Sequence, residues 1–200
     1  MTGKISCFMQ QDKKMARAVQ ERFSSYLDRN RIRYTVDINM GTTRITMLYM
    51  SMDYCPDKIL ESCIWFYPDA AEVRVYYNEN GASWCANHKE NHPQLFRLLN
   101  FLNARLWVRG MDFASGQLYF PEYLYTPRIY MTEDESCDIS LTFMVNYDFY
   151  GLTELETNDF ITAACPDLMN ALSPFIFGVL LDQMSADEAI HFINKTLLKN

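Results

Sequence analysis

The sequence predicts an α+β fold, a two-layer sandwich in which a mainly antiparallel sheet packs against helices. The apolar period changes from about 3.6 residues to 2 residues just after Asn30, which marks a helix followed by a strand. The strands that follow are joined by short turns, so neighbouring strands are expected to pair antiparallel. Helical segments interrupt the strands and do not alternate strictly with them, which is typical of α+β proteins.

The first part of the chain is predicted to form one helix and four strands. Residues 12–29 carry apolar side chains at three- and four-residue steps, as an amphipathic helix does. Residues 34–40 and 45–49 alternate apolar and polar side chains, with Gly41-Thr42 turning the chain between them. Residues 59–67 and 72–77 are predicted as the next two strands. The Asn80-Gly81 pair then predicts a hairpin turn, with a short segment around Trp84 pairing back.

A leucine-rich helix is predicted over residues 92–108. Its leucines share one side of the helix: Leu95, Leu98, Leu99, Leu102 and Leu106. Asn91 or His92 is expected to cap this helix, Pro93 fits its first turn and Gly110 is placed to end it. We expect the helix to lie across the sheet and to touch other helices at its edges. Strand patterns return at 117–120, 128–131 and 138–147.

The C-terminal part of the chain, about 152–200, is predicted to be helical. Thr153-x-x-Glu156 and Ser185-x-x-Glu188 both match the capping box that starts a helix. Pro166 and Pro174 lie inside an apolar helical period and are expected to kink or break it, because proline lacks the backbone donor.

Length and composition predict a single α+β domain over residues 1–200. With 49% hydrophobic and 22% charged residues the chain is typical of globular proteins. No apolar run reaches the roughly 18 residues that a membrane span needs, so no membrane association is expected. The N-terminus does not match a signal peptide and the six cysteines form no Cys-x-x-Cys pair, so we expect reduced, mostly buried thiols and a cytoplasmic location.

The charge distribution argues against nucleic-acid binding. The formal net charge is −7, divided into +5 over residues 1–50 and −12 over residues 51–200. Nucleic acids require a concentrated basic face, which an acidic chain does not favour. The basic start is expected to lie near the acidic remainder or to be solvated. A weaker alternative is an anion contact through Arg22, Arg29, Arg31 and Arg33.

No motif of the sequence indicates catalysis, a cofactor or a metal. With seven glycines the chain contains neither a dinucleotide-binding fingerprint nor a phosphate-binding loop, and no Gly-x-Ser-x-Gly turn is present. The nearest approach to a metal site is Cys85-x-x-His88-x-x-x-His92, which lacks a visible fourth ligand. The sequence therefore predicts no catalytic residues, no cofactor and no metal.

An aromatic segment at residues 119–130 is the candidate contact surface. Its five aromatic residues are Tyr119, Phe120, Tyr123, Tyr125 and Tyr130, interrupted by two prolines. Tyrosine combines a large contact area with a polar tip, which suits protein interfaces. The alternative is that these rings cover the sheet of the same molecule.

The order of elements resembles a known family. The helix LFRLLNFLNARL, the strands GQLYF and CDISLTFMVNY, and the helical LTELETNDFITAACPDLMNALSPFIFGVL follow one another as in the bacterial YbjN-like proteins, and the run Leu98–Asn103 matches that family's helix pattern. The resemblance covers about residues 12–185. It implies a fold similar to type III secretion chaperones, frequent dimerisation and a chaperone-like or regulatory role. The aromatic stretch 120–136 departs from the short hairpin usual in that family.

Together these observations predict a non-enzymatic protein-binding module, chaperone-like or regulatory, acting as a homodimer on a protein or peptide partner. The alternative is a small-molecule-binding protein or an enzyme with a cleft between the sheet and the C-terminal helices. A deep pocket lined by perturbed acidic, histidine or cysteine side chains would favour that alternative.

Overall fold

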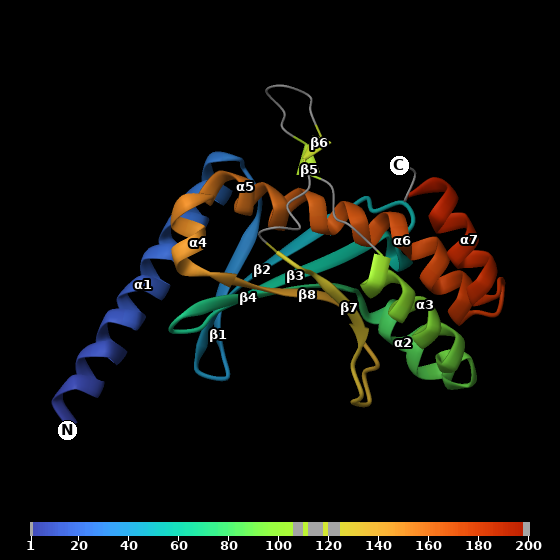
Figure 1. Ribbon diagram of the computed structural model, residues 1–200, viewed down its shortest axis with the longest axis horizontal. Helices are drawn as coiled ribbons and strands as arrows, with labels where there is room; N and C mark the ends of the chain where they lie inside the picture. Colours follow the sequence, from blue (N-terminus) through green and yellow to red (C-terminus); the bar gives the residue numbers. More distant parts are fainter. Residues whose placement is uncertain (1, 106–109, 112–117, 120–124, 198–200) are drawn as a thin grey trace.

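The fold is built on one six-stranded antiparallel sheet, as Figure 1 shows. The computed structural model describes residues 2–105, 110–111, 118–119 and 125–197, with side chains described for 14–105 and 125–197. In spatial order the strands are β1 (Tyr34–Asn39), β2 (Thr42–Met50), β3 (Ile59–Phe66), β4 (Ala70–Tyr77), β8 (Ile139–Asn146) and β7 (Arg128–Met131). Two further strands, β5 (Gly110–Met111) and β6 (Leu118–Tyr119), pair with each other apart from this sheet.

The helices form the second layer and lie on one face of the sheet (Figure 1). They are α1 (Thr2–Arg29), α2 (Glu79–Asn87), α3 (His92–Arg105), α4 (Tyr147–Leu152), α5 (Glu154–Asp159), α6 (Cys165–Leu180) and α7 (Ala186–Thr196). Short turns η1 (Pro56–Lys58) and η2 (Lys89–Asn91) join elements, and a π-helical turn, η4 (Phe160–Ala164), links α5 to α6. The two-layer α+β sandwich predicted from the sequence is therefore confirmed.

The core lies between the two layers and follows the period of 2 that the strands show in the sequence. On β4 the side chains of Ala71, Val73, Val75 and Tyr77 are buried, while their neighbours are only half-buried. Strands β2, β3 and β8 alternate in the same way, with Ser140 and Cys63 as buried exceptions on the opposite face. Within the described residues no helix covers that opposite face, which we call the uncovered face.

The hairpin predicted at Asn80-Gly81 is wrong, because both residues lie in helix α2. Asn78 stands at the start of that helix in an extended conformation. A Cβ atom at Gly81 would come within 2.5 Å of the Tyr77 Cβ. The glycine is therefore required by close packing of the helix on β4, and not by a positive φ. Trp84 also lies in α2 and contacts the Phe177 ring edge-on, with ring centroids 5.5 Å apart.

Helix α3 buries its leucine row, but it does not lie across the sheet as expected. Leu95, Leu98, Leu99 and Leu102 are buried, and Leu106 lies outside the described residues. The helix packs against α6, α7 and the edge strand β7 at one end of the molecule (Figure 1). The broad apolar side of this helix is therefore used for packing between helices, with only one strand beneath it.

The C-terminal helices confirm one predicted cap and correct the other. Ser185 accepts a hydrogen bond from the Glu188 N–H and the Glu188 carboxylate accepts one from Ser185, so this capping box forms. Thr153 instead donates its hydroxyl to the Phe149 carbonyl and does not cap α5. Helix α4 already begins at Tyr147, earlier than the sequence predicts, because Asn146 caps it.

Neither proline breaks the long helical run. Pro166 lies in the first turn of α6, directly after the π-helical turn, where the wider spacing of the chain accommodates a residue without an N–H. Pro174 is accommodated inside α6. The continuous run Glu154–Leu180 is 27 residues long and apolar enough to cross a membrane by length and composition, contrary to expectation. Its most apolar window is 56% buried within the fold, as in a core helix.

A buried serine hydroxyl in the core is expected to lower the stability of the folded protein. Ser62 on β3 is completely buried on the helix-covered face, and its hydroxyl has no hydrogen-bond partner among the described residues. A buried hydroxyl without a partner destabilises the folded state. We expect Ser62→Ala to raise the free energy of unfolding by about 1 kcal/mol in urea titrations. A loss of stability instead would show that the hydroxyl is hydrogen-bonded in solution.

Candidate functional site

The uncovered face of the sheet carries a row of paired charges around one tryptophan. Trp65 lies between two guanidinium groups, with Arg44 Cζ 5.9 Å and Arg74 Cζ 5.1 Å from the ring centroid. Arg44 forms a two-point ion pair with Asp37, and Arg74 pairs with Glu72 at 2.7 Å. Because each cation has its own carboxylate, this row stiffens the sheet and leaves little net charge to attract a ligand.

A second cluster on the same face surrounds Cys63. Its thiol lies 3.3 Å from the hydroxyls of both Thr46 and Tyr76, and Tyr76 donates a hydrogen bond to the Glu61 carboxylate. Burial raises the pKa of Cys63 and also that of Tyr76. A thiol with a raised pKa stays protonated near neutral pH and is a poor nucleophile. The cluster therefore has the chemistry of a packing network.

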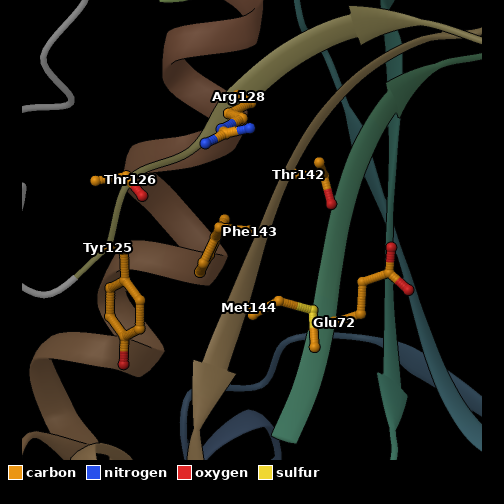
Figure 2. A pocket seen from close by; sticks show the side chains of 7 residues that line it. All are labelled: Glu72, Tyr125, Thr126, Arg128, Thr142, Phe143 and Met144. Carbon is orange, nitrogen blue, oxygen red and sulfur yellow. The ribbon is translucent and has the colours of Figure 1, made fainter.

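A groove opens at the other edge of the sheet, beside Arg128, the first residue of β7. The last paired residues are Arg128 and Thr142, so among the described residues β8 has no neighbour on this side from Phe143 onward. The groove has a volume of about 380 Å³. It is lined by Glu72, Tyr125, Thr126, Arg128, Thr142, Phe143 and Met144. Figure 2 shows that these side chains come from both faces of the sheet and surround the edge of β8.

The backbone of β8 offers hydrogen-bonding groups to this groove. The Thr132 N–H donates to the Asp138 carbonyl at 2.9 Å, so Asp138 directs its backbone groups toward β7. Backbone groups alternate in direction along a strand, which assigns the N–H and C=O of Met144 to the same side. No described residue pairs with Met144 there. The groove thus combines an open strand edge with side-chain contacts on either side of it.

The walls of the groove are partly apolar and carry the cationic side chain of Arg128. Met144 is 53% exposed, and Phe143 is buried beneath the groove. Arg128 is exposed, and among the described side chains no carboxylate lies within 4.0 Å of its guanidinium group. Glu72, on the opposite wall, is held by Arg74 and by the Tyr67 hydroxyl at 3.1 Å. Among the described side chains that line the groove, Arg128 is therefore the charged group that lacks an ion-pair partner.

The floor of the groove is held by stacked rings. The Tyr125 ring stacks on Phe160 at 5.5 Å and lies 5.2 Å from Phe143. Its hydroxyl lies 2.6 Å from the Thr157 hydroxyl in the core. Burial raises the pKa of Tyr125, so its phenol stays protonated near neutral pH. These contacts leave Tyr125 as a rigid support beneath the groove.

The five aromatic residues predicted as a contact surface fall in different environments. Tyr125 is buried at 4% exposure, so for this residue the intramolecular alternative is what the structure shows. Tyr130 is half-buried on the uncovered face. The backbone of Tyr119 lies in β6, whereas its side chain and the whole of Phe120 and Tyr123 lie outside the described residues. Of the five predicted residues, Tyr125 lies at the groove, whereas the sequence indicated neither Arg128 nor the unpaired part of β8.

The weak metal motif is only partly assembled. Cys85 is buried, and its thiol lies 3.8 Å from the His92 Nε2, which also contacts the Cys85 carbonyl at 2.8 Å. The His88 Nδ1 instead contacts the Trp84 carbonyl. Burial raises the pKa of Cys85 to about 12, which disfavours the thiolate that metals require. In the part of the chain that the structure describes, no three His, Cys, Asp or Glu residues gather as ligands.

One cavity between the sheet and the helices, lined by described residues, is small. It lies among α1, α4, η4 and the strands, and has a volume of about 10 Å³. Its lining is apolar: Val19, Phe23, Ile64, Phe66, Ala71, Val145, Tyr150 and Ile161. A cavity of this volume has room for about one water molecule. It therefore offers no space for a metabolite of the kind that the alternative function requires.

Comparisons with other proteins found no match for this chain among protein-family models, curated proteins or solved structures. The resemblance to the YbjN-like proteins therefore stays a prediction.

Proposed function

We propose that this protein is a non-enzymatic protein-binding module that holds an extended segment of a partner protein against the open edge of β8. The observation that carries the proposal is the groove of about 380 Å³ around that edge. An extended peptide added to a sheet edge gains backbone hydrogen bonds, and its alternate side chains reach the two faces of the sheet. Residues on both faces of β8 line the groove, which fits this mode of binding.

The charge of the groove supports a preference for an acidic segment. Arg128 lies where the paired part of β7 begins and has no carboxylate within reach among the described side chains. An Asp or Glu of the partner would therefore gain a charge-assisted hydrogen bond there. Apolar side chains on either side of that residue would contact Met144 and Phe143. We propose a partner segment in which one acidic residue is flanked by β-branched or aromatic residues.

The test is selection of short random peptides displayed on phage against the immobilised protein. We expect the enriched peptides to share an acidic residue at a fixed place in an apolar, extended pattern. The best peptide, fluorescently labelled, is then titrated with protein while its anisotropy is measured. Arg128→Glu is expected to weaken its binding by about tenfold or more, because the ion pair becomes a repulsion.

The control for this charge reversal is Lys195→Glu on α7. Lys195 is exposed and does not line the groove, yet its replacement changes the net charge by the same amount. We expect this variant to bind the peptide as the unaltered protein does. Met144→Pro removes the N–H assigned to the open edge and should also weaken binding. Selection of no peptide, or peptides insensitive to both groove variants, would contradict the proposal.

The alternative function predicted from the sequence places a ligand between the sheet and the C-terminal helices. A second candidate is a small molecule bound in the β8 groove instead, because the volume of that groove lies within the range of about 300–1,000 Å³ that ligand pockets span. The phage experiment also tests this alternative, because a small-molecule site gives no common peptide pattern. The chaperone-like or regulatory role and the cytoplasmic location remain parts of the proposal that rest on the sequence.

A further inference from the structure

The opposite edge of the sheet, strand β1, is also open. β1 pairs with β2 on one side, and no described residue pairs with it on the other. Its middle residues Thr35, Val36, Asp37 and Ile38 are all exposed. Sheet edges are usually protected by lysine, proline, a bulge or a covering segment. β1 contains no lysine or proline, and its one charged residue, Asp37, is already paired with Arg44.

The turn after β1 determines which backbone groups point outward. Met40 and Gly41 form a two-residue loop with φ values of 48° and 79°, and Asn39 pairs with Thr42 across it. In a hairpin of this type the closing pair exchanges both hydrogen bonds. Alternation along the strand then directs the backbone of Thr35 and Asp37 toward β2. The N–H and C=O groups of Tyr34, Val36 and Ile38 therefore face the open edge.

The side chains at this edge are unusually apolar for an exposed strand. Val36 is 49% exposed and Ile38 is 76% exposed. Val36 lies opposite Ile45, and Ile38 lies opposite Thr43. Residues opposite each other in an antiparallel pair point to the same face, so both side chains point to the helix-covered side, as the core residue Ile45 does. At the edge, however, the described parts of the helices leave both side chains exposed. Open backbone groups beside uncovered β-branched side chains are the features of a strand that pairs with another strand.

We infer that β1 pairs antiparallel with β1 of a second copy, joining two six-stranded sheets edge to edge about a twofold axis. A second copy fits because the strand is complementary to itself. With Val36 on the axis, Val36 lies opposite Val36 of the second copy, and Tyr34 lies opposite Ile38. On the uncovered face Thr35 then lies opposite Asp37, which places a hydroxyl beside a carboxylate.

Two physical requirements favour the register centred on Val36 over the registers centred on Thr35 or Asp37. These requirements are the absence of like charges opposite each other and the number of strand residues that pair. The outward backbone groups belong to even-numbered residues, so the register changes only in steps that keep even residues opposite one another. Moving the axis to Asp37 would place two carboxylates directly opposite each other, which is destabilising. Moving it to Thr35 would leave Ile38 beyond the start of the opposing strand. The register centred on Val36 avoids both problems.

This inference does not depend on the proposed peptide site. β1 and the β8 groove lie at opposite edges of the sheet, with the other strands between them. A dimer joined through β1 would leave both grooves accessible. The dimer would then present two peptide sites, which raises the effective affinity for partners that carry two segments.

The experiment is sedimentation-velocity ultracentrifugation of the full chain and two variants. The unaltered protein is expected to sediment as a dimer. Val36→Lys places two ammonium groups opposite each other on the axis, so this variant is expected to sediment as a monomer. The control, Phe192→Lys, introduces the same charge at a residue that is 47% exposed on α7, which packs on α3 and α6 and not on β1, and should remain a dimer.

Cysteine crosslinking tests the register independently. Under mild oxidation Val36→Cys is expected to form a covalent dimer, which is seen on a non-reducing gel. Thr35→Cys, Asp37→Cys and the unaltered chain are expected to stay uncrosslinked, because only position 36 faces itself. A monomeric unaltered protein, a dimer that survives Val36→Lys, or crosslinking at position 35 or 37 instead of 36 would each overturn the inference.

Discussion

Phe160→Ala is expected to lower the free energy of unfolding by about 3–5 kcal/mol, the loss typical of removing a buried aromatic ring. Phe160 is 1% exposed and lies in the π-helical turn η4. Its ring contacts Phe143 of β8 edge-on at 5.1 Å and stacks on Tyr125 at 5.5 Å. The substitution therefore opens a cavity between the helical layer and the sheet. In a chain of this length the midpoint of thermal unfolding should fall by about 10 °C.

The measurement is urea unfolding followed by circular dichroism, with Phe149→Ala as the matched control. Phe149 lies in α4 and is 52% exposed, so the same truncation there should cost less than about 1 kcal/mol. Because Tyr125 and Phe143 form the floor of the groove, the labelled peptide should also bind Phe160→Ala more weakly. Equal losses for the two phenylalanine variants would contradict the packing described for Phe160.

The free energy of unfolding is expected to fall steeply as the pH rises from about 10 to about 12. In this range buried tyrosines lose their phenolic protons more readily in the unfolded chain than in the folded chain. Burial, helped by a hydrogen bond donated to Asp159, raises the pKa of Tyr26 from 10.0 to about 12. Burial also raises the pKa of Tyr76, Tyr147 and Tyr150. Below about pH 10 these phenols are neutral in both states, and their contribution to stability is fully present.

Above that pH the unfolded chain loses phenolic protons that the folded chain still holds, so the unfolded state is favoured. A difference of two pKa units corresponds to about 3 kcal/mol for Tyr26 alone. The check is urea unfolding at pH values from about 8 to about 12, combined with the ultraviolet absorbance of tyrosinate.

The control variants for the alkaline transition separate buried from exposed phenols. Tyr26→Phe should be less stable than the unaltered protein near neutral pH, because its hydrogen bond to Asp159 is lost. Its stability should then decline less steeply at high pH. Tyr54→Phe, at a residue that is 64% exposed, should leave the slope unchanged. The same slope for Tyr26→Phe and the unaltered protein would show that Tyr26 is not a source of the transition.

The candidate site was only partly predictable from the sequence. The dense aromatic segment drew attention to residues 119–130, and Tyr125 does lie at the groove. Its role, however, is to support the floor from the core through Phe160, which is 35 positions away along the chain. The sequence predicts β7 over 128–131, its observed extent, but nothing in the alternation of residues 138–147 indicates that β7 pairs with β8, or that this pairing begins at Arg128 and Thr142 and leaves Phe143 onward without a described neighbour. The sequence does not single out Arg128 as a contact residue for a partner. That role follows only from the positions of the described carboxylates, none of which lies within 4.0 Å of its guanidinium group.

Local signals failed where packing imposed a different requirement. Asn80-Gly81 is a strong turn signal, yet the glycine serves a helix that lies too close to Tyr77 for a side chain at that position. Thr153 matches a capping box, yet its hydroxyl bonds back to Phe149 in the preceding helical turn. Pro166 was expected to disrupt the helix, and a π-helical turn accommodates it instead.

The sequence by itself determined the strands of the main sheet, most of the helices that cover one of its faces and the α+β class, because alternation at periods of 2 and 3.6 records which side of each element is buried. Only the tertiary structure decided that the described residues leave one face and two edges of the sheet without a partner, that α3 packs on other helices, and that Tyr125 is buried. The physical reason is that the spacing of apolar residues along a segment shows which of its sides is buried, but not which other element buries that side. An edge strand is one that pairs with another strand on one side only. The alternation of its residues does not show whether it has one partner or two.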